Sequence, residues 1–386
     1  SDVVPGNKTP RFVLWLFYLY IMSAPFFAFS LLNIGNRGIL WVDWVTSAIF
    51  IAFSLLGVLS GRSLFPKSPM NLWIMLFAYS ALFSIISLFS VNAGNNQFID
   101  FATKGTQLVL ALLFFYCVSS LALSEKDFKG IFRFWIIVAT LVSIFAIYQV
   151  FAFSFNWPYA SLSFNNPSVT NQGGEARFIQ GFGQVSSVFR EPSYLGAYLL
   201  APIIIVGIFL LRGQGDQILF RSSTLNWSIL AVLFAAFMLT SSQAAYLSLV
   251  VTVASMFTIN KVGRWRVLRL IIYMLFLALI GGLVLSLFNI DFIGATIYRF
   301  NYLIINMMHP NTTLEVTSYR VRTECMNVAF QVWEKSPIIG VGLNNMSYYT
   351  TVCEFSLGWS QLLVDQGVIG VRSEEHTSEL QSRSDL

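Results

Sequence analysis

The stretch FREPSYLGAYLLAPIIIVGIFLLR (Phe189–Arg212) places two fixed charges directly before a long apolar run. A helix needs about 20 mainly apolar residues to cross the hydrocarbon core of a bilayer, and residues 192–211 supply such a run. Pro192 suits the first turn of a helix, where the N–H that proline lacks would have no intrahelical partner. The sequence therefore predicts a membrane-spanning helix that begins directly after Arg190 and Glu191.

The rest of the chain has the composition of a membrane protein. Of its 386 residues, 56% are hydrophobic and 11% are charged, whereas soluble domains carry about 25% charged residues. We predict an all-α, polytopic membrane fold with about ten spanning helices. The predicted spans lie near 12–32, 39–60, 70–91, 105–124, 131–154, 192–211, 225–241, 243–260 and 268–289, and a tenth begins near 355.

The segment TSSQAAYLSL (Thr240–Leu249) leaves the number of spans open. Only TSSQ separates the runs 225–241 and 243–260, which form either two helices or one bent unit, so the total is about nine or ten. Small residues allow helices to approach closely in lipid. We therefore assign a packing role to this segment.

Basic residues in the loops predict the orientation of the chain. Short cytoplasmic loops of membrane proteins are enriched in lysine and arginine. The loop KVGRWRVLR (Lys261–Arg269) satisfies this rule only when the N terminus lies in the cytoplasm. The net charge of +5 is spread over short loops of this kind. Orientation in the bilayer accounts for that charge, and we expect no nucleic-acid partner.

Two segments are too long for the short-loop pattern, and both fall on the outer side in this orientation. We predict one polytopic membrane domain over residues 1–371, with extracytoplasmic loops at about 155–190 and 291–354. Ordered loops of such length are usually functional. The last residues, RSEEHTSELQSRSDL (372–386), resemble the translation of a sequencing adapter. We treat them as a non-native tail that follows a truncated tenth span.

The first candidate site lies at the start of the helix predicted at 192–211. A helix N-terminus carries a partial positive charge and free N–H groups, and together with an arginine it forms an anion site. Arg190 stands beside this terminus, and Arg177 precedes it by the glycine-rich turn QGFGQ (Gln180–Gln184). The guanidinium fork binds phosphate through parallel hydrogen bonds. The alternative, which the residues leave open, is that Arg190 and Glu191 pair as interfacial anchors.

The second candidate site is SYRVRTECMNVAFQVWEKSPIIGVGLNN (Ser318–Asn345) in the second long loop. The spacing predicts a helix that ends near Pro337. Its predicted face consists of Arg322, Met326, Ala329, Phe330 and Trp333. A solvated amphipathic helix on the membrane surface is the alternative. Cys325 and Cys353 form either a disulfide or two free thiols, and the sequence does not decide between them.

Three motifs in this order carry a family resemblance. FREPSYLG, then the arginine-led helix closed by SPIIGVGLNN, then LLVDQGVIG resemble the O-antigen polymerase and ligase family, meaning Wzy-type polymerases and their ligase relatives. The resemblance covers Arg177 to Val371. It implies a GT-C-like, metal-independent glycosyltransferase of the bacterial inner membrane, in lipopolysaccharide or related polysaccharide biosynthesis. Its substrates would be undecaprenyl-pyrophosphate-linked oligosaccharides at the periplasmic face, and a chain-length regulator would be a partner.

The resemblance also assigns roles to residues of this chain. The residues expected to bind the substrate pyrophosphate are Arg177, Arg190, Arg320 and Arg322. Of these, Arg190 and Arg322 are expected to be catalytic, because they would stabilise the charge of the leaving pyrophosphate. Glu191 is the expected acceptor of the proton from the attacking sugar hydroxyl. Glu175 and Glu324 remain equally open for that role.

The chain departs from the ligase pattern at one position. Ligases of this family carry a histidine shortly before the G-x-x-G of the following span, and that slot holds Ser356 here. We therefore predict a polymerase, with a ligase of the same family as the first alternative. A transporter or flippase of lipid-linked oligosaccharides is the second alternative, although the spans contain few charges. We expect no metal and no cofactor, since H-E-x-x-H and C-x-x-C motifs are absent.

Overall fold

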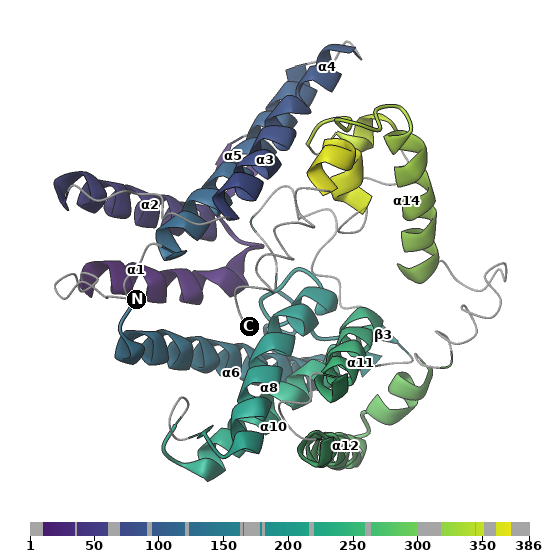
Figure 1. Ribbon diagram of the computed structural model, residues 1–386. Helices are drawn as coiled ribbons and strands as arrows, with labels where there is room; N and C mark the ends of the chain where they lie inside the picture. The colour runs from purple at the N-terminus through teal and green to yellow at the C-terminus, as the bar shows by residue number, and fades with distance from the viewer. Residues whose placement is uncertain are drawn as a thin grey trace. The chain divides into compact units, whose positions relative to one another are not determined.

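The computed structural model describes residues 11–34, 37–60, 70–90, 95–119, 123–162, 165, 178–179, 182–215, 220–258, 264–298, 301, 318–343, 345–350 and 360–371. Helices dominate this part of the chain (Figure 1). They are α1 (Arg11–Ser23), α2 (Trp41–Ser60), α3 (Met70–Phe83), α4 (Ile86–Ser90), α5 (Asn95–Ser119), α6 (Glu125–Phe155), α8 (Pro192–Arg212), α10 (Ser223–Leu239), α11 (Gln243–Thr258), α12 (Arg264–Leu287) and α14 (Ser318–Trp333). Residues 292–298 and 360–371 are also helical.

Short strands and turns complete the described chain. β1 (Ser30–Ile34) pairs with β2 (Arg37–Leu40), and β3 (Phe178–Ile179) pairs with β4 (Phe182–Gly183), each as an antiparallel hairpin. Single 3-10 turns lie at Ala24–Phe26 and Met346–Tyr348. The hairpins are too small to change the all-α class of the fold.

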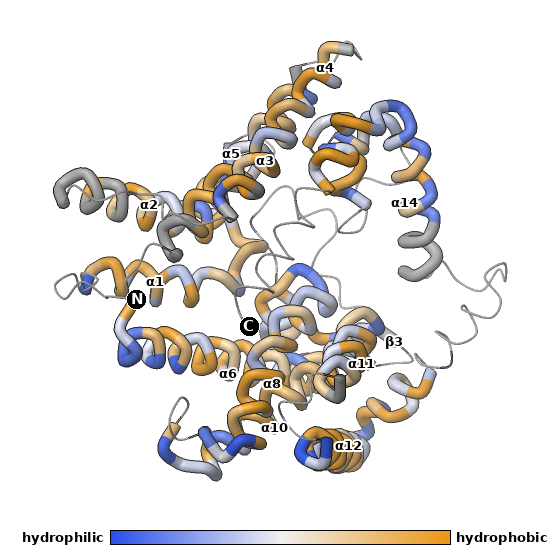
Figure 2. Tube along the Cα trace, in the orientation of Figure 1, coloured by the Kyte–Doolittle hydropathy of each residue, from blue (hydrophilic) through white to orange (hydrophobic). Residues whose placement is uncertain are grey.

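Membrane-spanning helices are present as the sequence predicts. Within the described residues, four helical stretches are long and apolar enough to cross a bilayer, namely residues 97–115 of α5 and the helices α6, α8 and α12. Shorter apolar helices precede residue 97 and also lie between α8 and α12 along the chain (Figure 2). On α12, Leu275, Leu279 and Leu283 are 65%, 55% and 54% exposed, as expected where lipid covers the surface. The predicted all-α polytopic membrane fold is confirmed.

Hydroxyl residues mark three helix ends within the predicted apolar runs. The span predicted at 12–32 ends as a helix at Ser23, the span 70–91 breaks at Ser84 between α3 and α4, and Thr240 separates α10 from α11. Each of these hydroxyls donates to the backbone carbonyl three residues earlier, at 2.9, 2.7 and 2.7 Å. Such bonds compete with the helical pattern. The runs 225–241 and 243–260 are therefore two helices.

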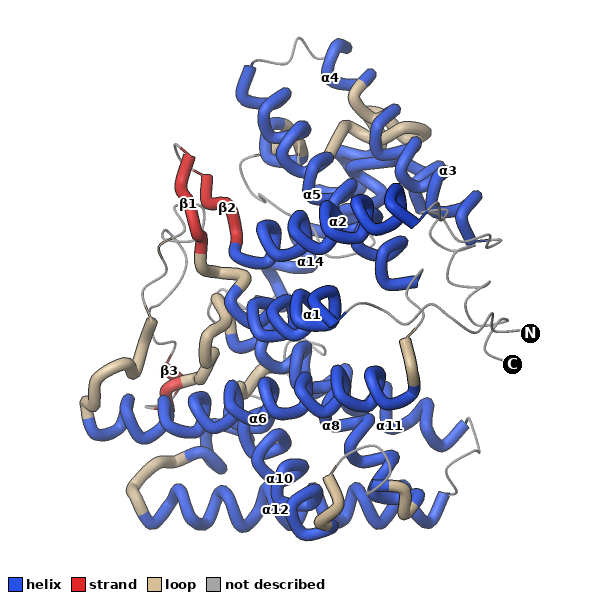
Figure 3. Tube along the Cα trace, turned by 90° about the vertical axis from the view of Figure 1, so that its left-hand side faces the viewer, coloured by secondary structure: helices blue, strands red, loops and turns tan. Residues whose placement is uncertain are grey.

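The chain divides into two compact units, each described by itself. The first comprises Ser1–Ala48 and Ala122–Met307. Its core lies where α6, α8, α10 and α12 pack together, and its largest fully buried side chains include Ile136, Leu199 and Phe237. Figure 3 shows these helices together with the hairpin of β1 and β2. The described segment 182–191 belongs to this core, because Val185, Ser187 and Phe189 within it are buried.

The second unit comprises Ile49–Leu121 and Met308–Leu386. Its described residues include α3, α4, α5 and α14. Cys325, Ala329 and Val332 of α14 are buried together with Val341, Met346 and Val364 in one apolar cluster. The predicted helix is present, but its buried stripe starts from Cys325 rather than from Met326, because Met326 and Phe330 are only half-buried.

Candidate functional site

The segment from Gln184 to Arg190, called the arginine segment below, leads directly into α8. It has no regular secondary structure, yet most of it is buried inside the first unit. A buried backbone of this kind needs partners for its N–H and C=O groups. Gln149 of α6 supplies such partners, and Gln184 of the segment itself binds backbone carbonyls at the break between α10 and α11.

Gln149 of α6 binds both backbone groups of Ser187. The Ser187 N–H donates to Oε1 of Gln149 at 2.7 Å, and Nε2 of Gln149 donates to the Ser187 carbonyl at 3.3 Å. The Ser187 hydroxyl donates to the carbonyl of Val142 at 2.8 Å. Ser187 has φ of 53°, a left-handed conformation that costs a non-glycine residue about 1–2 kcal/mol. These three bonds hold the segment against α6.

Gln184 attaches the other end of the segment to the break between α10 and α11. Its Nε2 lies 3.3 Å from the Thr240 carbonyl and 3.1 Å from the Ser241 carbonyl and donates to both. These carbonyls are available because α10 has ended at Leu239. The packing role predicted for TSSQAAYLSL is also present, since a Cβ on Gly196 would lie only 2.4 Å from Cβ of Ala245.

Arg190 and Glu191 stand at the N-terminus of α8, as the sequence predicts. Glu191 is the N-cap residue, and its carbonyl accepts from the N–H groups of Tyr194 and Leu195 at 3.1 and 3.4 Å. The Ser193 hydroxyl donates to the Glu191 carboxylate at 3.3 Å. Arg190 is half-buried, and its Nε is buried without a hydrogen-bond partner among the described residues. The site therefore offers a guanidinium N–H group beside a helix N-terminus.

Aromatic rings hold the residues on both sides of Arg190. The ring of Phe189 lies 5.7 Å from that of Phe27 and 5.2 Å from that of Tyr198. Phe27 also contacts Tyr194 of α8, with ring centroids 5.3 Å apart. The arginine is thus presented by a rigid support. Arg177 and Glu175, which the sequence also proposes for this loop, lie outside the described residues.

Arg320 and Arg322 lie in the first turns of α14, as expected, although their side chains lie outside the described residues. Glu324 is exposed on the same helix. At the other end, the Trp333 ring N–H donates to the Pro337 carbonyl at 3.0 Å, and the Lys335 ammonium lies 5.0 Å from the centre of the Tyr349 ring. These contacts lie where α14 ends and the motif SPIIGVGLNN begins.

The motifs SPIIGVGLNN and LLVDQGVIG bind each other through their backbones. Val341 N–H donates to the Val364 carbonyl at 2.8 Å, and Val368 N–H donates to the Pro337 carbonyl at 3.0 Å. Gly340 and Gly367 have φ of 74° and 65°, and a Cβ on either would approach the opposite backbone within 2.4 and 2.2 Å. We call this the glycine contact. Only glycine fits both the conformation and the space.

Residues 228–371 match the family model Wzy_C, whose description is O-Antigen ligase. This part of the chain is similar to the O-antigen ligase family. The family is a glycosyltransferase-like class of membrane enzymes, so the resemblance predicted from the motifs is confirmed at that level. No curated protein matches the chain.

The O-antigen family domain includes α10, α11, α12, α14 and the glycine contact, but its match does not extend to Arg190. The ligase histidine slot, Ser356, falls within the matched range but outside the described residues. The match therefore supports the family and leaves polymerase and ligase activity undistinguished.

Buried polar residues of the family domain were not found from the sequence. Asp365 is 7% exposed, Gln366 is 2% exposed, and Asn345 is 1% exposed. The Ser80 hydroxyl of α3 donates to Oε1 of Gln366 at 2.7 Å, which ties the helix 360–371 to α3 within the second unit. The available signal was an acid and an amide inside the apolar run LLVDQGVIG. Asp365 adds a buried carboxylate to the candidates for proton transfer.

Cys325 is disulfide-bonded, and its partner lies outside the described residues. The structure thus decides for Cys325 between the two alternatives that the sequence left open. Within the described part of the chain, no group of three or more His, Cys, Asp or Glu residues forms a metal site.

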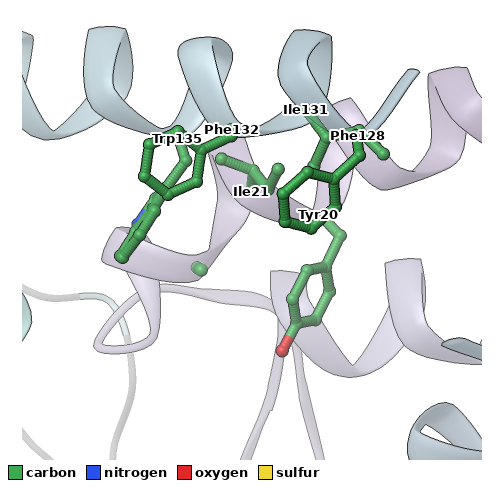
Figure 4. Close-up of a pocket in the computed structure, with 7 residues that line it drawn as sticks. Tyr20, Ile21, Phe128, Ile131, Phe132 and Trp135 are labelled. Atoms are coloured by element: carbon green, nitrogen blue, oxygen red, sulfur yellow. The ribbon is translucent and has the colours of Figure 1, made fainter. Parts of the chain in front are cut away.

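The cavities of the first unit have apolar walls. One of about 230 Å³ lies between α1 and α6 and is lined by Tyr20, Ile21, Phe132, Trp135 and their neighbours; the Tyr20 hydroxyl points away from the labelled rings (Figure 4). Another of about 220 Å³ lies among α6, α10 and α12. Tyr20 is the one ionisable residue in the lining of these two cavities and no carboxylate, histidine or arginine lines either of them, so the candidate site remains at Arg190.

Proposed function

We propose that this protein polymerises undecaprenyl-pyrophosphate-linked oligosaccharide repeat units at the periplasmic face of the bacterial inner membrane. The observation that carries the proposal is Arg190 at the N-terminus of a 21-residue apolar helix, with a buried Nε that has no hydrogen-bond partner among the described residues. A lipid-linked pyrophosphate places its anionic group at the membrane surface, where this helix begins. The family domain at 228–371 supplies the enzyme class.

The proposed reaction needs no redox change. The acceptor hydroxyl oxygen bonds to the anomeric carbon of the donor glycan, and the bond from that carbon to the pyrophosphate oxygen breaks. Undecaprenyl pyrophosphate leaves with the bonding electrons. Because this leaving group is already good, orientation and charge stabilisation supply most of the catalysis. Arg190 and Arg322 are the proposed catalytic arginines, and Arg177 and Arg320 are the further proposed pyrophosphate ligands.

The hydroxyl proton passes to a carboxylate in this scheme. Glu191 is the first candidate, because it is the N-cap of the helix that Arg190 precedes. Glu175 and Glu324 are the other candidates from the sequence, and Asp365 joins them from the structure. The proposed orientation places the N terminus in the cytoplasm, and a chain-length regulator is the proposed partner.

A ligase of the same family is the second candidate function, because the matching family model is described as O-Antigen ligase. The two reactions share donor chemistry and differ in the acceptor. Ser356 at the histidine slot favours the polymerase. A flippase is the third candidate, and it would move the lipid-linked unit without breaking its glycosidic bond.

Single replacements of Arg177, Arg190 and Arg322 by glutamine test the proposal in cells that depend on this protein. For a polymerase, long polysaccharide chains disappear while single capped units remain. Loss of all attached glycan would instead identify a ligase, and lipid-linked units retained in the cytoplasm would identify a flippase. Arg212→Gln, at the exposed opposite end of α8, is the matched control and should leave chain length unchanged.

A further inference from the structure

Gln149 is a polar residue in the C-terminal part of the apolar helix α6 (Glu125–Phe155). It is 1% exposed, and Val142, Ala146 and Val150 of the same helix are buried around it. Burial of a carboxamide is costly unless its hydrogen bonds are satisfied. Both of its polar atoms bond to one residue, Ser187, which lies 38 positions away in the chain. The side chain of Gln149 in α6 therefore forms its hydrogen bonds with the backbone of the arginine segment.

The pair of bonds specifies the position of Ser187 closely. One carboxamide binds an N–H and a C=O of the same residue, so the backbone at Ser187 is fixed both in place and in orientation. The left-handed φ of 53° at this residue is a strained conformation that persists only where the surroundings over-determine it. Ser187 is followed by Val188 and Phe189, both buried, and then by Arg190.

The arginine segment is attached at a second point by Gln184, whose Nε2 donates to the Thr240 and Ser241 carbonyls. Ser241 also has a positive φ, 46°, and is fully buried. The segment is thus held between α6 and the α10–α11 break, and Arg190 lies at the end of the segment that leads into α8. Attachment of this kind is how a fold preorganises a binding group.

We propose that Gln149 is a positioning residue for Arg190. Its bond pair with Ser187 holds the arginine segment so that the guanidinium lies at the N-terminus of α8 in a geometry that accepts a diphosphate. Gln149 itself does not touch the ligand. The inference rests on the proposed function, because it takes the diphosphate of the lipid-linked substrate as the ligand of Arg190.

The test measures binding of undecaprenyl diphosphate to the full chain in lipid nanodiscs. Gln149→Met keeps the size of the side chain and removes both bonds, and we expect it to weaken binding about tenfold, as loss of two buried hydrogen bonds allows. Gln184→Met should weaken binding in the same direction from the other attachment point. Ser143→Ala is the control, since Ser143 is buried on the same helix but bonds only to Ala139 within it, at 2.8 Å.

Gln149→Glu gives a readout that simple destabilisation would not produce. A protonated glutamic acid reproduces the donor and the acceptor of glutamine, whereas the carboxylate has no donor for the Ser187 carbonyl. Burial favours the protonated form. The affinity of Gln149→Glu relative to wild type should therefore recover as the pH falls, while that of Gln149→Met should stay low throughout. The charged residues nearby are Arg190, which ends the segment, and Glu191, which follows it. Both are the same in all of these variants, so their effect on affinity cancels in the ratio.

Hydrogen exchange separates positioning from unfolding. In Gln149→Met, amide protection should fall in residues 185–190 and persist in α8 and α10. The inference is overturned if Gln149→Met binds the diphosphate within about twofold of wild type, or if the Gln149→Glu ratio does not change with pH. If Gln149→Met and Arg190→Gln both weaken binding but neither shortens the polysaccharide in cells, the proposed function fails while the positioning role stands.

Discussion

At the scale of single residues, the arginine before α8 carries the functional argument. Its place in the sequence, two residues before Pro192, was sufficient to identify it as a candidate anion ligand. The structure adds that Nε is buried and lacks a partner among the described residues. A buried donor without an acceptor is costly, so a ligand that accepts from Nε would gain from binding there.

The first prediction concerns the identity of this cation. Arg190→Lys keeps the charge but removes the planar fork, so it should retain only part of the activity, between wild type and Arg190→Gln. We expect a loss of about tenfold or more for lysine, because a point charge does not reproduce two parallel hydrogen bonds to phosphate. The rate of glycan elongation from purified lipid-linked units measures the effect. Equal activity of the lysine variant and wild type would contradict bidentate binding.

At the scale of elements, the helices are connected by short polar contacts in an apolar surrounding. Gln149 joins α6 to the arginine segment, Gln184 joins that segment to the α10–α11 break, and the glycine contact joins a loop of the family domain to the helix 360–371. Each contact satisfies backbone groups that a helix would otherwise satisfy internally. This is the condition under which irregular backbone is tolerated at membrane depth.

The second prediction tests the glycine contact. Gly367→Ala should destabilise the protein by about 2 kcal/mol or more, because alanine adds a clash to an unfavourable positive φ. Gly340→Ala should destabilise the protein to a similar extent. The double variant should lose less free energy of unfolding than the sum of the two single variants, because both changes disrupt the same contact. Thermal unfolding in detergent measures the change.

A glycine elsewhere in the chain provides the comparison. Gly281 lies within α12, and a Cβ there would meet nothing within 4 Å. Gly281→Ala should therefore leave the unfolding temperature unchanged or raise it slightly, since alanine favours the helix. If Gly281→Ala and Gly367→Ala lowered stability equally, the effect would not arise from the glycine contact.

At the scale of the whole molecule, the proposed membrane orientation is consistent with the disulfide-bonded state of Cys325. In the proposed orientation, which follows from the positive-inside rule, residues 291–354 lie on the outer side, and disulfides persist in oxidising compartments such as the periplasm. The disulfide at Cys325 lies in this segment. A disulfide at Cys325 is the redox state that the proposed orientation predicts for this segment.

The third prediction identifies the partner of Cys325. Cys353 lies in the same loop, whereas Cys117 lies in the apolar helix α5. Without reductant, alkylation followed by mass spectrometry should label only Cys117 in the native membrane. Cys353→Ser should make Cys325 reactive, and Cys117→Ser should not. Labelling of Cys325 in the unreduced wild-type protein would contradict both the bridge and the outer location of the loop.

The sequence by itself determined the class of the fold, four of the membrane-spanning helices, the helix that carries Arg320 and Arg322, and the place of Arg190 before α8. These are local properties, because the length of an apolar run must match the bilayer and a proline marks the first turn of its own helix. Only the tertiary structure decided that Gln149 hydrogen-bonds to Ser187 and that Asp365 is buried. It also decided that Gly340 and Gly367 each pack closely against the backbone of the other motif. Hydrogen-bond partners far apart in the chain depend on how helices pack, and no periodicity in the sequence records that packing.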